Sequence, residues 1–242
     1  MFGFFKKSSN NITFDLKVDI HSHLIPGVDD GAENIDDSIE LIKKFIDLGY
    51  TKLVTTPHIM ADYYKNTPET INSGLQKLKE KIAELGLNIH IEAAAEYYLD
   101  DGFNKLLKSA EMLTFGDNYL LFETSYTQRP FALNDTIFEI ASKGYKPVIA
   151  HPERYRYIKN FKEYKKLKEL GCYFQINLNS LNGGYGESAK KRVDYIVENG
   201  LIDFLGSDCH NIKHIKGIKS ILNNKKLMQN IYNKNKILNM SL

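Results

Sequence analysis

The chain has 242 residues, enough for one large domain or two small ones, and 43% of them are hydrophobic against 26% charged. This balance is typical of a soluble globular protein and excludes a disordered chain. The net charge of +2 argues against a nucleic-acid-binding protein, and no apolar run approaches the length of a membrane span. The two cysteines, Cys172 and Cys209, are too few for a disulfide framework, so we expect a cytoplasmic protein.

Residues 1–16 contain aromatic residues and two lysines, without a long apolar core or a small-residue cleavage site. We expect them to form an N-terminal arm rather than a secretory signal. The rest of the chain shows no linker, no low-complexity block and no shift in composition. We therefore predict a single domain over residues 17–242.

A pattern repeats along the chain after an opening strand that begins at Val18. A segment of helical spacing ends in glycine, and a short apolar strand follows and ends in a polar residue. The glycines are Gly49, Gly86, Gly144, Gly171 and Gly200. One more strand, at residues 119–123, follows a short predicted helix around residues 103–108. The strands after the first end, in chain order, at His58, Glu96, Glu123, His151, Asn179 and the pair Asp208 and His210.

Seven strands that alternate with helices predict a parallel sheet with right-handed crossovers. Metal-competent side chains fall at the C-terminal ends of these strands, and in a β/α barrel those ends meet on the face that carries active sites. We therefore predict an α/β fold, a distorted (β/α)7 TIM-like barrel with its active site at the C-terminal ends of the strands. An open doubly wound sheet is the alternative, and it would spread the same residues along a line.

His21 and His23 open the predicted site, because residues two apart on a strand face the same way. Alone, a His-x-His pair is as often two ordinary histidines as a metal site. Imidazole and carboxylate ligands without thiolate suit Mn²⁺, Fe²⁺ or Zn²⁺, and carboxylates crowded into one barrel mouth are costly to bury without cations. The predicted metal ligands are His21, His23, Asp30, His58, Glu96, Glu123, His151, Asp208 and His210. This set exceeds what one ion can use, so we predict two or three divalent ions.

Several segments, taken together in this order, are characteristic of one protein family. DIHSHLIPGVDDGA, TTPH, EYYLD, FETSY, AHPERY, QIN and GSDCHN resemble the PHP (polymerase and histidinol phosphatase) family, from about Asp19 to Asn211. More closely, the chain resembles the bacterial manganese-dependent protein-tyrosine phosphatases that are encoded with capsule and exopolysaccharide genes. The resemblance implies the PHP fold and Mn²⁺, with Fe²⁺ or Zn²⁺ as alternatives. It also implies a substrate, the phosphotyrosine tail of a membrane-associated bacterial tyrosine kinase that controls polysaccharide export.

The resemblance also implies roles for single residues. The first ion is held by His21, His23, Glu96 and Asp208, and Glu96 bridges to a second ion whose further ligands are Glu123 and His151. The third ion is held by Asp30, His58 and His210. Asp30 has the family's spacing from His21, and Asp29 is its neighbour. The residues predicted to be catalytic are Glu96, Asp208 and Arg154.

Arg154 matches an arginine that contacts the substrate phosphate, a role that suits a planar fork of donors. Close relatives carry a second arginine five residues after the last metal histidine, and here that position is Ile215. Lys213, His214 and Lys216 flank it and are the predicted substitutes, with His214 also a candidate proton donor. A lysine is a point charge and cannot copy bidentate contact.

Other interpretations stay open at this point. The first is a small-molecule phosphatase of the histidinol-phosphate type, and the second is a nuclease-like PHP domain or a non-enzymatic scaffold. A cysteine phosphatase is improbable, because no arginine closes a phosphate loop after Cys172 or Cys209. The segment Gly183–Gly186 predicts a lid or a connecting turn. Four tyrosines near the strand ends are candidates for either a substrate pocket or packing: Tyr63, Tyr64, Tyr97 and Tyr98.

Overall fold

The computed structural model describes residues 16–109 and 111–242. Of the predicted N-terminal arm, only Leu16 falls within these ranges, where it is buried, and the rest of the arm lies outside the described residues. Among the helices of the described ranges, none combines the length and the apolar character that crossing a membrane requires.

The described residues form nine strands, which correspond to the seven predicted ones because two of these are interrupted. The strands are β1 (Val18–Asp19), β2 (Lys52–Thr55), β3 (His58–Ile59), β4 (His90–Ala93), β5 (Glu96–Tyr98), β6 (Tyr119–Glu123), β7 (Lys146–Ala150), β8 (Tyr173–Asn177) and β9 (Phe204–Gly206). Pro57 separates β2 from β3, since proline has no N–H to donate to the ladder. The predicted strand end at Asn179 is wrong, because residues 178–180 form the 3-10 turn η2 (Leu178–Ser180).

All pairings between these strands are parallel. One sheet has the order β1-β2-β4 and the other the order β3-β5-β6-β7-β8-β9. The chain after β9 returns to the chain after β1: Ser22 and Cys209 form a parallel bridge, and the Asp208 N–H donates to the His21 carbonyl at 2.8 Å. The predicted α/β fold of TIM-like type is therefore confirmed, and its distortion is the division into two sheets.

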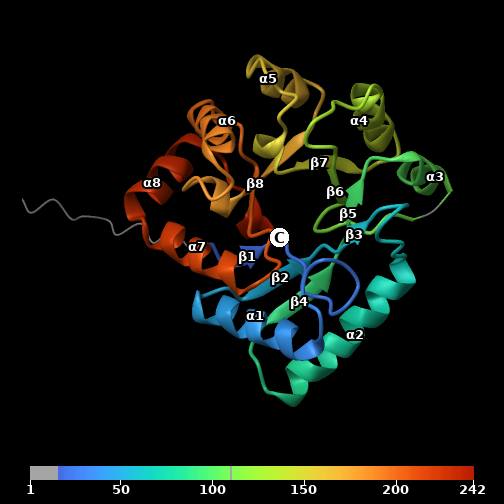
Figure 1. Cartoon of the computed structure of the whole chain (residues 1–242), viewed down its shortest axis with the longest axis vertical. Coiled ribbons are helices and arrows are strands. Elements are labelled where there is room, and N and C mark those ends of the chain that lie inside the picture. Colours follow the sequence, from blue (N-terminus) through green and yellow to red (C-terminus); the bar gives the residue numbers. More distant parts are fainter. Residues whose placement is uncertain (1–15, 110) are drawn as a thin grey trace, which may run out of the picture.

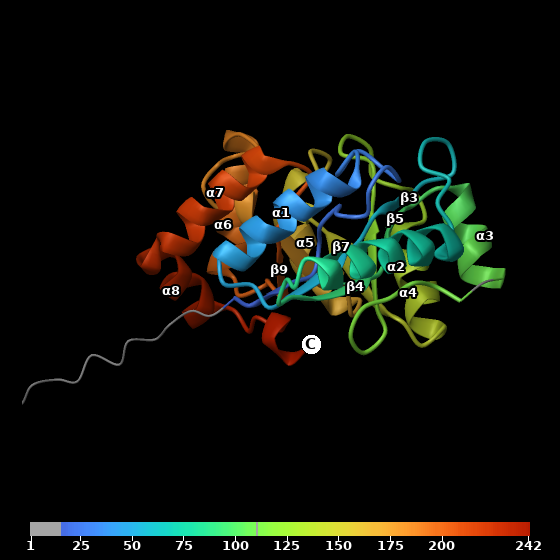
Figure 2. The ribbon, with the colours of Figure 1, turned by 90° about the horizontal axis from the view of Figure 1, so that it is seen from below.

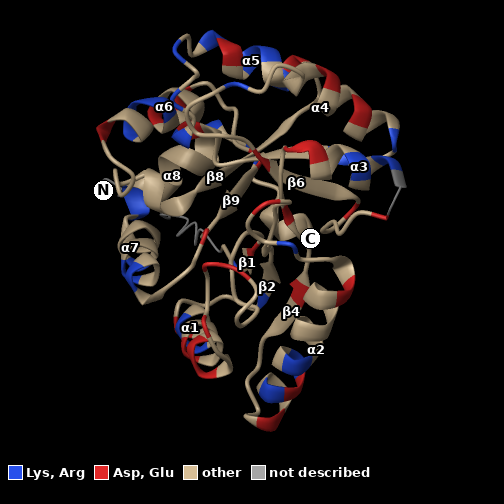
Figure 3. Ribbon diagram, turned by 45° about the vertical axis from the view of Figure 1, so that its right-hand side comes forward, with Lys and Arg blue, Asp and Glu red and all other residues tan. Residues whose placement is uncertain are grey.

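Eight helices of the described ranges surround the strands (Figure 1). They are α1 (Ile35–Asp47), α2 (Pro68–Glu84), α3 (Asp101–Ser109), α4 (Leu133–Ser142), α5 (Lys162–Glu169), α6 (Glu187–Glu198), α7 (Ile212–Asn223) and α8 (Lys225–Lys234). Figure 2 shows the ring from the side of α1 and α2, which cross the view in front of the strands. Both signs of charge lie on the outer helices, for example on α2 and α5 (Figure 3).

The core lies between this layer of helices and the strands, and it fixes where the strands end. α1 buries Ile39, Ile42 and Phe45, and the central strands are buried almost throughout, as parallel strands covered on both faces are. Each fully buried side chain of this size contributes about 1.5–3 kcal/mol. The strand ends are therefore held by a large apolar core, and side chains placed there have little freedom to shift.

The predicted helix-terminating glycines are confirmed. Each follows a helix with a positive φ, the left-handed conformation that ends an α-helix at little cost only for glycine. The φ values are +91° at Gly49, +61° at Gly86, +85° at Gly144, +83° at Gly171 and +66° at Gly200. The repeated glycine is thus a stop signal that sends the chain from each helix into the next strand.

Replacing Gly144, which follows α4, with Ala is expected to lower the free energy of unfolding by about 1–2 kcal/mol. The added Cβ would meet no atom within 4 Å, so the cost comes from the φ of +85° alone. Gly144→Asn should recover part of the loss, because Asn tolerates this conformation better. Urea denaturation of both variants measures the difference, and a Gly144→Ala variant as stable as the wild type would contradict the explanation.

Candidate metal centre and active site

The predicted ligands gather at one end of the strands. Four overlapping groups of side chains have ligand atoms within 4.8 Å of one another, and together they contain all nine residues named from the sequence. The groups are His23, Asp30, His58 and His210; His21, His23 and Asp208; His21, Glu96 and His151; and His58, Glu96 and Glu123. They come from seven separate places along the chain, which only the converging strands bring together.

Four of these side chains form a compact set deep in the site. His21 Nε2 lies 3.1 Å from Glu96 Oε2 and 3.6 Å from Asp208 Oδ1. His23 Nε2 lies 3.6 Å and 3.5 Å from the same two oxygens. Two imidazole nitrogens and two carboxylate oxygens thus face one point, and they are the set that the family resemblance implies for the first ion.

Glu96 presents its two oxygens to different partners. Its Oε1 lies 2.9 Å from His151 Nε2, which is 3.9 Å from Glu123 Oε2. Its Oε2, which faces His21, also lies 3.3 Å from His58 Nδ1. A carboxylate that is shared in this way has the geometry of a bridge between two ions.

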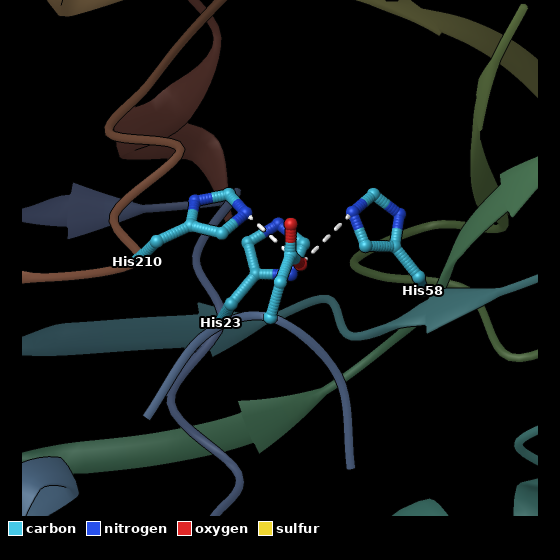
Figure 4. A group of neighbouring side chains, drawn as sticks. His23, His58 and His210 are labelled. Carbon is cyan, nitrogen blue, oxygen red and sulfur yellow. Dashed lines mark ion pairs between the residues drawn. The ribbon is translucent and has the colours of Figure 1, made fainter. Parts of the chain in front are cut away.

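The third set is nearer the surface. Asp30 Oδ1 lies 3.5 Å from His58 Nε2 and 3.4 Å from His210 Nε2. Figure 4 shows His23, His58 and His210 with their rings turned toward one another from three different segments, and dashed lines mark the two ion pairs. The Asp30 side chain is 52% exposed, so this part of the cluster opens to solvent.

Neighbouring acceptors fix the orientation of two of the histidines. The amide oxygen of Gln175 lies 2.8 Å from His21 Nδ1, and the backbone carbonyl of Asp208 lies 2.9 Å from His210 Nδ1. Because these oxygens only accept, each Nδ1 donates to its neighbour, and each Nε2 is directed into the cluster. Metal-binding histidines are supported in the same manner.

Asp29 supports the cluster without belonging to any of its four groups. Its Oδ2 lies 2.7 Å from His23 Nδ1 and accepts the backbone N–H of His58 at 3.1 Å. Although burial opposes it, the adjacent His23 lowers the pKa of the Asp29 carboxyl to about 2. Asp29 therefore orients a histidine, and Asp30 faces the cluster.

The site contains several buried carboxylates close together, and divalent cations would offset their negative charge. Burial, reinforced by the charges of Glu96 and Asp208, raises the pKa of Glu123 well above its usual range. The buried Nδ1 atoms of His58 and His151 have no hydrogen-bond partner in the described part of the chain. Crowded carboxylates that face imidazole nitrogens fit a cluster of divalent cations, which would offset the repulsion between the carboxylates.

A cavity of about 420 Å³ opens onto this cluster. Arg154, which ends the 3-10 turn η1 (Pro152–Arg154), forms part of its wall and donates from Nη1 to Asp208 Oδ2 at 3.0 Å. The guanidinium contacts two aromatic rings, 4.6 Å from the centre of Tyr126 and 4.4 Å from that of Tyr185. A fixed, charged fork of donors is thus held beside the predicted metal ligands.

The predicted substitutes for the second arginine lie in different places. His214 lines the cavity, and its Nδ1 lies 2.9 Å from the Asp208 carbonyl. Lys213 and Lys216 are exposed on α7 and do not line this cavity. Ile215 is buried in the hydrophobic core because its position on α7 faces inward. Of the three substitutes, the structure thus places only His214 at the cavity.

Sequence reasoning missed the positioning residues Gln175 and Asn177. They alternate on β8, and Asn177 Nδ2 donates to Asp208 Oδ2 at 2.6 Å. Two polar residues at that spacing on a buried strand are a signal that could have identified them. It also missed Tyr126 and Tyr185, the second of which lies in the segment predicted as a lid or connecting turn.

Of the four tyrosines named from the sequence, Tyr64 stacks on His58 with ring centres 5.4 Å apart. Tyr97 is buried in the core, where its hydroxyl accepts the Leu113 N–H at 2.7 Å. Both cysteines are buried, and burial raises the pKa of Cys172 to about 12 and that of Cys209 well above its usual range. Neither is suited to act as a thiolate nucleophile.

The sequence matches the family described as "Capsular polysaccharide synthesis, CpsB/CapC" over residues 17–239. The chain belongs to this family. Tyrosine-protein phosphatase YwqE of Bacillus subtilis (strain 168) is 33% identical to this CpsB/CapC chain over 198 residues, 81% of this chain and 78% of YwqE. Tyrosine-protein phosphatase CpsB of Streptococcus pneumoniae is 33% identical over 207 residues, 81% of this chain and 83% of the relative.

The fold of this CpsB/CapC chain is also similar to a solved structure from the pair YwqE of Bacillus subtilis and CpsB of Streptococcus pneumoniae, which are described as unique metal-dependent tyrosine phosphatases. The TM-score is 0.80 at 30% sequence identity, and the match covers 90% of each chain. The resemblance to this type of phosphatase, stated from the sequence motifs, is confirmed by these matches.

Removing the carboxylate of Asp29 is expected to weaken metal binding about 10- to 100-fold, because His23 would lose the partner that orients it. Asp29→Asn keeps an acceptor for His23 Nδ1 and should fall between Asp29→Ala and the wild type. Titration of the metal-depleted protein with Mn²⁺ measures the affinity. Asp117→Ala removes an exposed carboxylate that pairs with Lys146, and it serves as the control. Equal affinities for Asp29→Ala and Asp117→Ala would contradict the orienting role.

Proposed function

We propose that this chain is a metal-dependent tyrosine-protein phosphatase. Its substrate would be the phosphotyrosine tail of a membrane-associated bacterial tyrosine kinase that controls capsule or exopolysaccharide export, and the reaction would take place in the cytoplasm. The observation that carries the proposal is the cluster of nine metal-competent side chains, six of which line one cavity together with Arg154. The relatives named tyrosine-protein phosphatases support the substrate class.

The cofactor in this proposal is a cluster of two or three divalent ions, Mn²⁺ first, with Fe²⁺ or Zn²⁺ as alternatives. His21, His23, Glu96 and Asp208 would hold one ion, Glu96, Glu123 and His151 the next, and Asp30, His58 and His210 a third. When bound, such ions act as Lewis acids that activate water and offset the charge of a phosphate group.

The role of Arg154 follows from its surroundings. Asp208 accepts from one guanidinium nitrogen, and the rings of Tyr126 and Tyr185 lie against the guanidinium at 4.6 and 4.4 Å. Although burial opposes it, the charge of Asp208 raises the pKa of Arg154, so the group stays cationic. The donors left over are fixed before substrate arrives, and they match the oxygens of a phosphate group.

His214 has a more limited role in this proposal. Burial lowers the pKa of its imidazole, so the ring is neutral at pH 7. Its Nδ1 lies 2.9 Å from the Asp208 carbonyl oxygen and 3.3 Å from the backbone nitrogen of His210, so the ring is held at the cavity wall. We therefore assign it a hydrogen bond to substrate or water rather than protonation of the leaving group.

Removal of metal provides the direct test of the enzyme. Incubation with excess chelator is expected to abolish hydrolysis of a phosphotyrosine peptide, and Mn²⁺ should restore it, because the carboxylates of the site need the cations. Metal analysis of the purified protein should find two or three divalent ions per chain. Histidinol phosphate, tested in parallel, should be hydrolysed more slowly. Full turnover by a protein without metal would refute the proposal, and a preference for histidinol phosphate would refute the substrate class.

Replacing Arg154 with Ala is expected to lower kcat/KM for a phosphotyrosine peptide about 10- to 100-fold, the cost of losing a charged hydrogen-bond partner. Arg154→Lys should recover only part, since a lysine offers a point charge instead of a fork. Lys213→Ala and Lys216→Ala, which remove exposed cations outside the cavity, are the controls and should stay within about twofold of the wild type. Metal content is measured for each variant, and an Arg154→Ala enzyme within about twofold of the wild type would show that the arginine does not handle phosphate.

A further inference from the structure

A second, smaller cavity of about 170 Å³ adjoins the active-site cavity. Its lining residues are Tyr126, Arg154, Arg156, Tyr185, Ser188, Ala189 and Arg192. Tyr126, Arg154 and Tyr185 line both cavities, so the guanidinium that faces the metal cluster and its two flanking rings form the wall between them. A group bound in the second cavity would therefore contact side chains that also line the active-site cavity.

The positively charged residues that line this cavity are arginines, which are rare in this chain. Lysine and arginine together number 32, yet only Arg129, Arg154, Arg156 and Arg192 are arginines, and the last three line this cavity. Lysine provides positive charge almost everywhere else. Arginine is required where a planar fork binds phosphate or carboxylate through two oxygens, and lysine cannot copy that contact.

Arg192 is the clearest sign of a binding site. It is only 5% exposed, and its guanidinium donates to the Ser188 carbonyl, the Ser188 hydroxyl and the Ile158 carbonyl at 2.9, 2.8 and 3.3 Å. All three acceptors are neutral, and no ion pair joins Arg192 to a carboxylate within residues 16–109 and 111–242. Buried cations are usually paired, so a charged partner from outside the chain suits this position.

The other residues that line this cavity are either cationic or neutral. The Arg156 side chain is exposed at the rim, and its backbone N–H donates to the Tyr126 carbonyl at 2.7 Å, which holds the segment in place. Ser188 and Ala189 belong to the first turn of α6, where free N–H groups and the helix dipole favour an anion. None of the seven lining residues is acidic, and the nearby Glu187 carboxylate pairs with Lys191.

We propose that this second cavity is an anion subsite. It would hold a second negatively charged group on the same substrate segment as the phosphotyrosine that is hydrolysed, either the phosphate of another phosphotyrosine or the carboxylate of an acidic residue. This inference rests on the proposed function. Because Arg154 lines both cavities, the subsite selects segments whose two anions flank this guanidinium.

The test compares peptides that share one phosphotyrosine and differ at one flanking position, which is Gln, Glu or a second phosphotyrosine. The variable residue is moved through the flanking positions in turn, and kcat/KM is measured with the metal-loaded protein. The wild type should prefer the anionic peptides at the best position. Arg156→Gln should lower that preference about tenfold. Arg129→Gln, which removes the arginine outside the cavity, should leave the preference unchanged, and neither variant should alter hydrolysis of p-nitrophenyl phosphate, which has no second anion.

Arg192→Lys adds a second measurement, since it keeps the charge and loses the fork, and it should also reduce the preference. If the Arg192→Lys variant fails to fold, the Arg156→Gln variant still tests the subsite, because Arg156 is exposed. A preference for phosphotyrosine over Glu would identify phosphate as the natural occupant, and equal preference would show that any carboxylate or phosphate serves. Equal anion preferences in Arg156→Gln, Arg129→Gln and the wild type would overturn the subsite while leaving the phosphatase intact. A wild type that hydrolyses p-nitrophenyl phosphate but no phosphotyrosine peptide would overturn the proposed substrate class and the subsite with it.

Discussion

The structure depends on one fully buried carboxylate. Glu96 lies within 3.3 Å of imidazole nitrogens of His21, His58 and His151, which reach it from three other parts of the chain. A carboxylate removed from water must be matched by positive charge or by donors; although burial opposes it, the histidines lower the pKa of Glu96, whereas burial and the charge of Glu96 raise that of Glu123. Cations at the cluster would offset the charge of these carboxylates. The strand ends that bring the carboxylates together therefore also create the need for metal. β5, which lies between β3 and β6, puts Glu96 at the centre of the cluster.

A second layer of hydrogen bonds makes that centre rigid. Gln175 and Asp29 each hold the far nitrogen of a cluster histidine, and Asn177 holds the outer oxygen of Asp208. These residues fix which nitrogen of each ring faces the cluster, which a ligand's side-chain type alone does not decide. They come from β8 and from the loop after β1, and the same packed strands position them. The precision of the site is therefore supplied by the core rather than by the ligands themselves.

Arg154 connects this chemistry with the choice of substrate. It reaches the cluster through Asp208 on one side and lines the second cavity with Arg156 and Arg192 on the other. Two aromatic rings pack against the guanidinium, which would reduce the entropy lost when an anion binds. In the function and the subsite that we propose, this one residue would contact both the reacting phosphate and a neighbouring anion.

The sequence alone determined the fold class and the identity of the candidate ligands. Glycine after each helix and polar residues after each strand are local signals, and parallel strands carry such residues to one face in any chain that has this order. The tertiary structure decided the rest, because it depends on the direction of each side chain. Asp29 and Asp30 are neighbours in the sequence, yet one orients His23 and the other faces the cluster.

The direction of each side chain also determines which lysines and arginines reach a cavity. Lys213 and Lys216 were natural substitutes for a missing arginine by sequence distance, but the turn of α7 directs them to solvent and Ile215 into the core. Arg156 and Arg192 are 36 positions apart by their numbering, and no local pattern joins them. Only the packing of α6 against the turn that carries Arg154 brings these guanidinium groups to one cavity, since long-range packing determines which side chains meet.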